Sequence, residues 1–396
     1  MDLSSPDTYA DGFPHEVFRE LRARDPVSLQ KDSTGKPFWA VTRYQDVVTV
    51  LRTPAVFSTW RGSVLFDDPP PEFLAKLRES MLNRDPPDHT RLRRLVNHVF
   101  SPRRIEMLEH QLASHARSLI ARVRGRQRCD FATDIAGEMP LFVICEILGI
   151  PHEDRTKLYA LTARMFANTT PETLKDAMAA ATALREYGVR LAAAKRETPE
   201  DDLLSDLVAA EVEGRHLTDG ELQAFFMLLF NAGADTTRSL LCLGLDLLFD
   251  HPATLAELRA DPAKVPDAIE EMLRYETPVI QFRRTATTAI RLGNAEIQEN
   301  DRVVVFFPSA NRDAAQFPDP DRFDIGRTPN PHLAFGHGPH FCAGANLARL
   351  EAKHVLLELL RGFPRLERAA PIVRSRTNFV RSVTSQPINL GDHAVE

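Results

Sequence analysis

The sequence has little of what marks secreted, membrane or nucleic-acid-binding proteins. Its four cysteines lie far apart and without paired spacing, so we expect a reducing compartment and no disulfide framework. No segment reaches the roughly 18 apolar residues of a membrane span, and the amino terminus lacks the basic start and apolar run of a signal peptide. A net charge of −6 is not the basic surplus that nucleic-acid binding calls for. These absences predict a cytoplasmic protein that binds neither membrane nor nucleic acid.

Apolar residues make up 43% of the 396 residues, which is enough for a large core. Their spacing is mostly helical, with a few alternating runs typical of strands. We therefore predict a mainly α fold with a small β region. Expected helices cover 15–24, 44–51, most of 105–200 and 219–250, and expected strands cover 27–30, 38–42 and 303–307.

Residues 53–82 interrupt this regularity with Gly62 and several prolines, so an irregular segment is expected there. The segment is nevertheless rich in large apolar side chains, among them Trp60 and Leu65. A long loop of this kind either packs down on the core or lines a pocket. The sequence leaves both readings open.

The most specific local pattern surrounds Cys342. Gly336 and Gly338 precede it, and the strongly helix-forming run Ala345–Ala352 follows. Glycines let a loop curl with its amides turned inward, and a helix start adds partial positive charge. Both effects favour the thiolate over the thiol. A thiolate fixed in such a bend is a metal ligand or a nucleophile.

Three interpretations of Cys342 compete. A buried free cysteine is common in general but needs neither the glycines nor the helix start. A zinc site would use His332, His337 and His340 with Cys342, all zinc ligand types, but no second ligand knuckle is present. In the third interpretation the sulfur is the axial ligand of a haem iron, a ligation that favours O–O cleavage.

Residues 335–344 (FGHGPHFCAG) resemble the haem-binding signature of the cytochrome P450 family, Phe-Gly-x-Gly-x-His-x-Cys-x-Gly, at every fixed position. The resemblance implies a cytochrome P450 fold in one domain over 1–396. It also implies haem b (iron protoporphyrin IX) with Cys342 as the iron ligand, in a chain of the soluble bacterial kind. His89 and Arg93 share one helical face and match the family's propionate ligands, as does Arg284, with Arg283 as its rival. The remaining cofactor contacts that we expect are Phe335, His340, Gly344 and Ala232.

A long helix over 219–250 is the second pattern of note. Thr218 and Glu221 predict a capping box at its start. Its middle turns polar at 231–237, and buried polar groups there cost about 1–3 kcal/mol each unless they are satisfied. This segment resembles the oxygen-binding motif of the same family, Ala-Gly-x-Asp/Glu-Thr. The resemblance implies that Thr236 stabilises bound oxygen and that Asp235 delivers protons, which makes both catalytic.

Glu271 and Arg274 form a Glu-x-x-Arg pair, which by itself is weak evidence of anything beyond a surface ion pair. With Arg322 in the later segment Pro320-Asp321-Arg322-Phe323, the pair resembles the family's buried Glu-Arg-Arg network. We expect these three residues to hold the loop that presents Cys342.

The reaction implied by the family is monooxygenation: one oxygen atom of O2 enters a C–H bond, or an alkene becomes an epoxide. The sequence contains no flavin or iron–sulfur segment, so electrons are expected from a ferredoxin and its NAD(P)H-dependent reductase. Arg91, Arg94, Arg104 and Lys353 provide either a cationic docking face for the acidic carrier or an ordinary solvated surface. Rival functions are a haem-thiolate peroxygenase, a nitrogen-oxide reductase and a non-catalytic binder of haem or hydrophobic ligands.

Substrate identity is only coarsely indicated. The expected wall residues are mostly large and apolar, which suggests a steroid, terpenoid, fatty acid or polyketide bound by a monomeric enzyme. These residues are Trp60, Leu65, Phe166, Leu228, Asn231, Ile280, Phe282 and Phe379.

Overall fold

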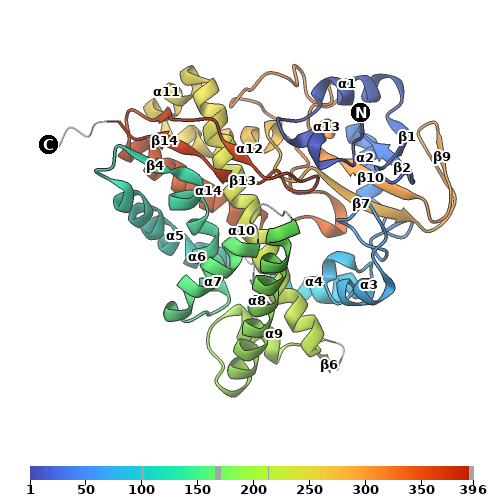
Figure 1. Ribbon diagram of the computed structural model, residues 1–396, viewed down its shortest axis with the longest axis horizontal. Helices are drawn as coiled ribbons and strands as arrows, with labels where there is room; N and C mark the ends of the chain where they lie inside the picture. Colours follow the sequence, from blue (N-terminus) through green and yellow to red (C-terminus); the bar gives the residue numbers. More distant parts are fainter. Residues whose placement is uncertain (100–101, 166–170, 213, 392–396) are drawn as a thin grey trace. The chain divides into compact units, whose positions relative to one another are not determined.

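The computed structural model describes residues 1–99, 102–165, 171–212 and 214–391 (Figure 1). The described residues fall into two compact units. Unit 1 comprises 1–94, 270–343 and 376–381, and unit 2 comprises 95–269, 344–375 and 382–396.

Unit 1 is built on a mixed sheet with the strand order β1-β2-β10-β7-β3. The predicted hairpin is confirmed: β1 (Val27–Lys31) pairs antiparallel with β2 (Pro37–Val41). β10 (Arg302–Phe306) lies between β2, to which it is parallel, and β7 (Gln281–Ala286), to which it is antiparallel. The expected helices are α1 (His15–Arg24) and α2 (Tyr44–Arg52), and the short β3 (Phe57–Ser58) closes the far edge.

Strand β10 is buried on both faces and separates two cores. Val303 and Val305 point to one cluster with Val47, and Val304 and Phe306 point to the other with Phe18. This alternation follows from the two-residue period of a strand, which sends successive side chains to opposite faces. A strand buried on both sides is therefore apolar at nearly every position.

The segment 53–82 is more regular than expected. It contains β3, a short helix α3 (Pro71–Leu77) and a 3₁₀ turn (Met81–Asn83). The prolines that suggest a loop lie at the start of α3, where the first turn needs no N–H donor. Phe66 is buried in one of the sheet's two cores, so this part of the segment packs down on the body of the unit.

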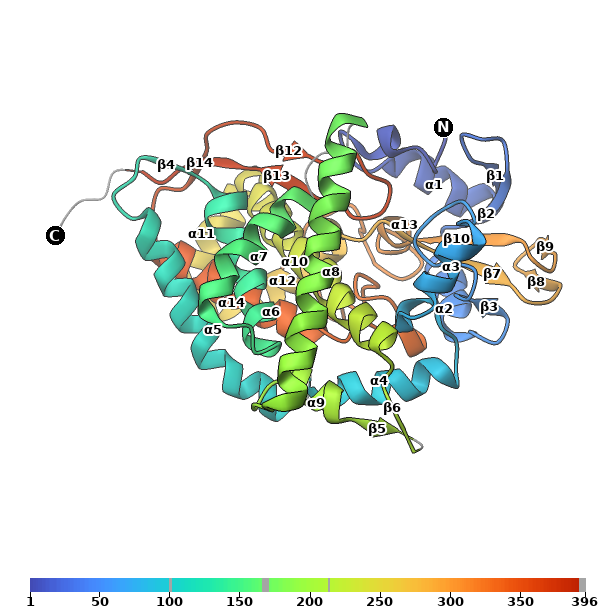
Figure 2. The same ribbon diagram turned by 60° about the horizontal axis from the view of Figure 1, so that its bottom comes forward.

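Unit 2 is a helical body around α10 (Asp219–Asp250), which packs against α6 (Glu138–Ile147), α8 (Pro171–Glu197) and α14 (Ala345–Gly362) (Figure 2). The predicted capping box is present: Glu221 N–H donates to the Thr218 hydroxyl, and Thr218 N–H donates to the Glu221 carboxylate. Gly233 serves helix packing, because a Cβ there would lie 3.1 Å from Ile144 of α6.

One strand inside the expected helical stretch was not predicted. β4 (Arg128–Asp130) follows α5 (Pro102–Val123) and pairs with β14 (Pro387–Asn389), about 260 residues later in the chain, with Cys129 opposite Ile388. β14 also pairs with β11 (Glu367–Arg368). Pairing across such a distance leaves no periodic signal in a three-residue segment.

The remaining elements complete the two units. They are η1 (Pro6–Tyr9), α4 (Asp88–Val99), η3 (Ala132–Ala136), α7 (His152–Met165), α9 (Leu203–Ala209), β5 (Glu211–Val212), β6 (Arg215–His216), α11 (Pro252–Ala260), η4 (Pro262–Lys264), α12 (Val265–Tyr275), β8 (Ile290–Leu292), β9 (Ala295–Ile297), α13 (Phe307–Ala310), η5 (Gly338–His340), β12 (Val373–Arg374) and β13 (Val383–Ser385).

Within the described ranges, no single helix is long and apolar enough to cross a membrane. The pair α10 and α11 meets the length and composition requirement only when taken together, and the two are bent by 107°.

Candidate active site

The cysteine loop, residues 333–343, turns tightly before it presents Cys342. Gly336 and Gly338 have φ angles of 72° and 70°, which favour glycine. A side chain at Gly338 would place its Cβ 2.4 Å from the carbonyl oxygen of Leu51, so only glycine lets this turn pack on α2. The Cys342 N–H donates to the Phe335 carbonyl at 2.9 Å. The loop is thereby closed, and Cys342 is exposed.

His89, Arg93, Arg284 and His340 gather in unit 1 as a cluster of basic side chains. The rings of His89 and His340 are 4.1 Å apart. Burial, together with the charges of Arg93 and Arg284, lowers the pKa of His89 to about 4. Burial and the same neighbours hold the pKa of His340 well below its usual value. In the described part of the chain, the buried His89 Nδ1 and His340 Nε2 have no hydrogen-bond partner.

The rivalry between Arg283 and Arg284 is resolved by their contacts. Arg283 is already occupied: its guanidinium pairs with Asp68 and donates to the Phe66 carbonyl at 3.0 Å. Arg284 donates to the carbonyl of Arg283 at 2.8 Å and, among the described residues, has no ion pair. Burial lowers the pKa of Arg284 to about 10. Arg284 is therefore the buried cation suited to an anionic ligand.

The centre of α10 opens where the sequence turns polar. Asn231 and Ala232 are exposed, although Phe230 just before them is fully buried. The Thr236 hydroxyl donates to the carbonyl of Ala232 at 2.7 Å, one turn earlier on the same side. An exposed patch in the middle of a core helix is where a ligand can approach its backbone and the Thr236 hydroxyl.

Asp235, next to this patch, is buried and held by two partners that sequence reasoning missed. Its Oδ1 accepts hydrogen bonds from the Arg238 guanidinium and from the Ser382 hydroxyl, the latter at 2.7 Å. Arg238 also donates to Ser382 at 2.9 Å. The spacing of Asp235 and Arg238, three residues apart on a helix, was a usable signal. Ser382, by contrast, arrives from the end of the chain.

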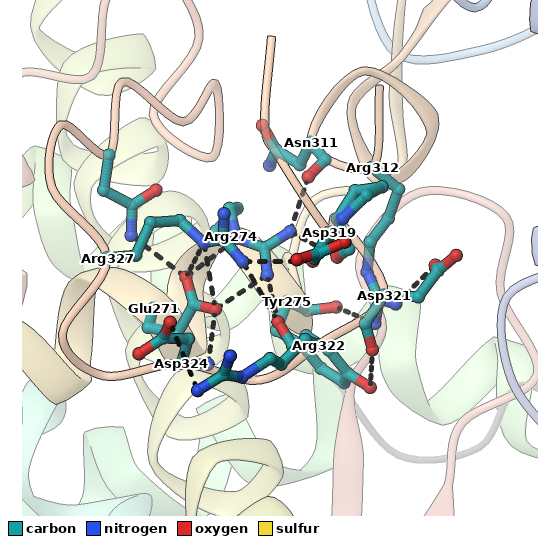
Figure 3. Close-up of polar contacts among 12 residues, drawn as sticks. Glu271, Arg274, Tyr275, Asn311, Arg312, Asp319, Asp321, Arg322, Asp324 and Arg327 are labelled. Atoms are coloured by element: carbon teal, nitrogen blue, oxygen red, sulfur yellow. Dashed lines mark hydrogen bonds and ion pairs between the residues drawn. The ribbon is translucent and has the colours of Figure 1, made fainter. Parts of the chain in front are cut away.

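Glu271 and Arg274 form a fully buried ion pair, as expected (Figure 3). The network reaches the cysteine loop at Leu333 and the segment just before it at Asn330. Glu271 accepts from Asn330 Nδ2 at 3.1 Å, and Asn311, whose carbonyl accepts from Arg274, accepts the N–H of Leu333 at 2.7 Å.

The prediction for Arg322 requires correction. Its side chain is 70% exposed and lies 3.8 Å from Asp324, and only its carbonyl oxygen contacts Arg274 (Figure 3). The second guanidinium on Glu271 belongs to Arg327, whose Nε lies 3.3 Å from Glu271 Oε2 and which is nearly buried. The sequence motif thus identified the right segment and the wrong arginine, because side-chain direction in a loop has no sequence period.

The predicted substrate contacts have mixed outcomes. Ile280 is wrong: it has no exposed surface and packs in the sheet core. Phe166 lies outside the described residues. Phe282 and Phe379 are half-buried and pack edge to face with centroids 5.3 Å apart. The other candidates remain predictions; of these Trp60, Leu65 and Asn231 are exposed and Leu228 is half-buried.

Two further hypotheses meet contrary contacts. For zinc, His332 is hydrogen-bonded to Glu270 at 3.1 Å and the ring of His340 lies tilted against that of His89, and the described residues contain no group of three or more metal-ligating side chains. For the docking face, Lys353 is paired with Glu109 at 2.8 Å, and the side chain of Arg104 is outside the described structure. Arg94 is exposed and Arg91 half-buried.

Residues 6–267 and 263–377 match the family model described as Cytochrome P450. This chain belongs to the cytochrome P450 family. It is 39% identical over 400 residues to "Putative cytochrome P450 126" of Mycobacterium tuberculosis, covering 96% of this chain and 94% of that protein. It is 34% identical to the steroid C26-monooxygenase of Rhodococcus jostii, over 97% of this chain and 83% of that one.

Among solved structures, Mycobacterium marinum cytochrome P450 CYP268A2 in complex with pseudoionone has a TM-score of 0.90 and 37% identity, covering 98% of each chain. The predicted fold is thereby confirmed, and so is the prediction that the protein is an enzyme of the P450 monooxygenase family.

Cytochrome P450s hold haem b, and haem b is the cofactor of this chain. The residues in unit 1 fit it. Haem carries two propionates, and this cluster contains the buried guanidinium of Arg284 and two buried histidine nitrogens that have no hydrogen-bond partner among the described residues. Haem iron takes a thiolate, and Cys342 is exposed at the mouth of its loop.

Proposed function

We propose that this cytochrome P450 inserts one oxygen atom from O2 into a hydrophobic small molecule, with electrons supplied by a ferredoxin and its NAD(P)H-dependent reductase. The observation that carries the proposal is the exposed centre of α10. There the Thr236 hydroxyl lies one turn from the exposed Ala232. The buried carboxylate of Asp235 lies in the same helix turn. A non-catalytic binding protein would need neither group at the centre of a core helix.

Haem b supplies the binding and reductive activation of O2. The residues that would hold it are Cys342 as the iron ligand, and His89, Arg93, Arg284 and His340 as propionate partners. Arg284 contributes a permanent charge, because even at a pKa of about 10 it is protonated at neutral pH. Phe335, Gly344 and Ala232 are expected to contact the porphyrin.

Thr236 and Asp235 have complementary roles in moving protons. The Thr236 hydroxyl gives its hydrogen to Ala232, which orients its lone pairs to accept a hydrogen bond from a ligand. The Asp235 Oδ1 accepts hydrogen bonds from Arg238 and Ser382, so this oxygen is not free to bond to a water or ligand while both donors are in place. Asp235 must therefore break its hydrogen bond to Arg238 or Ser382 before it can carry a proton inward. We infer that the bond to Arg238 controls this step.

The substrate class is proposed from apolar side chains and from relatives. Phe282 and Phe379 present half-buried rings in unit 1. One relative is a steroid C26-monooxygenase and another was solved with pseudoionone. We propose a substrate of steroid, terpenoid or comparable lipid character.

The test compares Thr236→Ala with Thr237→Ala, the same substitution one residue later on the buried side of the helix. We expect Thr236→Ala to keep its haem, to consume NAD(P)H with ferredoxin and reductase, and to release hydrogen peroxide instead of product. Thr237→Ala should keep the wild-type ratio of product to NAD(P)H consumed. An unchanged ratio in Thr236→Ala would remove this threonine from proton delivery.

The same preparation distinguishes the rival functions. A panel of steroids, terpenoids and fatty acids is screened for a ligand-induced change in the iron spin state, and the ligands that bind are then tested for turnover. Product that requires ferredoxin, reductase and O2 supports the proposal. Product formed equally fast with hydrogen peroxide alone would instead indicate a peroxygenase.

A further inference from the structure

The first and last chain segments of unit 1 contact each other. The C-terminal turn, residues 376–381, contacts the N-terminal segment, residues 3–13, through three side chains. Asn378 Nδ2 donates to the Ser4 carbonyl at 2.6 Å, and the Arg376 guanidinium binds both carboxylate oxygens of Asp7. The guanidinium of Arg381 lies over the Phe13 ring, 4.4 Å from its centroid.

The N-terminal segment is itself firmly held, although chain ends are commonly loose. Leu3 is only 1% exposed, and its carbonyl accepts the Tyr9 hydroxyl at 2.7 Å. Leu3, Tyr9 and Phe13 belong to the sheet core that also contains Phe66 of the segment 53–82. The contacts to the C-terminal turn therefore start from a buried segment. The N-terminal segment packs with Phe66 of the segment 53–82 and also contacts the C-terminal turn, and we expect both of these to lie near substrate.

The C-terminal turn carries the half-buried Phe379. Its backbone is tied to the start of β7: Ile280 N–H donates to the Phe379 carbonyl at 2.7 Å, and Arg381 N–H donates to Pro278 at 2.8 Å. Arg381 is buried and forms an ion pair with Glu276. The Phe379 ring packs on Phe282. The backbone contacts fix where the turn lies, whereas the side-chain contacts to Asp7 and Phe13 limit how far it can lift.

We propose that the N-terminal segment is a positioning element for Phe379 and thereby tunes which substrate the enzyme accepts. This inference rests on the proposed function, which places Phe379 beside the substrate. None of the residues to which we assign haem binding or proton delivery lies in the N-terminal segment. Its removal should change substrate affinity and leave the cofactor untouched.

The test uses the double variant Asp7→Asn/Phe13→Leu, which removes the ion pair and the cation–π contact but keeps an apolar side chain in the core. The matched control is Asp11→Asn, an exposed aspartate in the same segment. Both proteins are studied with haem bound, and the spectrum of the reduced carbon monoxide complex must match the wild type. Without any ligand, amide exchange at Ile280 and Arg381 should be about three- to tenfold faster in the double variant and unchanged in the control.

Binding of testosterone and of pseudoionone is then titrated through the spin state of the iron. The dissociation constant of a ligand that binds the wild type should rise by about the same three- to tenfold factor in the double variant. Unchanged exchange would overturn the proposal, and so would faster exchange with unchanged affinity. If neither ligand binds the wild type, the proposed substrate class is wrong, and the exchange rates alone decide whether the segment holds the turn.

Discussion

The hydrogen bonds of Arg274 allow the loss of unfolding free energy on its substitution to be worked out from the structure. All five N–H groups of its buried guanidinium are used: two bind Glu271 at 2.7 Å, and the others bind the carbonyls of Asn311, Pro320 and Arg322 at 2.9, 2.8 and 3.1 Å. Arg274→Lys keeps the charge but offers three donors from one nitrogen, so at least two buried acceptors lose their partner.

Each buried acceptor that loses its donor costs about 1–3 kcal/mol, so for two of them we expect Arg274→Lys to lose about 2–6 kcal/mol of unfolding free energy. This is a large part of the 5–15 kcal/mol typical of a folded protein. The cysteine loop depends on the same network through Asn311 and Leu333. We therefore also expect the haem-bound fraction with a thiolate-type carbon monoxide spectrum to fall.

Urea unfolding followed by circular dichroism measures the free energies, with Arg327→Lys and Arg322→Lys as companions. Arg327→Lys should cost about 1–3 kcal/mol, because Arg327 contacts Glu271 and donates to the Pro318 carbonyl at 2.7 Å. Arg322→Lys should cost under about 0.5 kcal/mol, since its side chain is exposed. A larger loss at Arg322 than at Arg327 would refute the assignment of Arg327 to the network.

Two further predictions concern buried charge. Arg284→Met should leave the haem-free protein at least as stable as the wild type, because it removes a buried cation that has no ion pair among the described residues. The same variant should lose haem about tenfold faster or more. Arg283→Met should instead destabilise the haem-free protein, because it removes the hydrogen bonds to Asp68 and to the Phe66 carbonyl. Burial raises the pKa of Glu351 to about 8 from 4.5, so between these values only the unfolded state releases the proton and stability falls as pH rises. Thermal or urea unfolding should show the wild type losing about 2–3 kcal/mol relative to Glu351→Gln between pH 5 and pH 7; parallel pH profiles would show that Glu351 is ionised in the fold.

Contiguous patterns were predicted well. The cysteine loop, the capping box and the polar centre of α10 each lie within about ten residues, where the required conformation or chemistry restricts the residue type directly. The hairpin β1–β2 was predicted for the same reason. Ile280 failed because its side chain turns into the sheet core, and an apolar residue next to a strand looks the same from either side.

The sequence by itself determined the family, the tight turn of the cysteine loop and the long central helix, because these depend on local backbone freedom and local polarity. Only the tertiary structure decided which arginine completes the Glu271 network and which of Arg283 and Arg284 has no ion pair among the described residues. It also decided that Ser382 and Arg238 restrain Asp235. Those outcomes depend on side chains that meet across tens to hundreds of residues, and the direction each one takes is set by packing and by the need to pair buried charge.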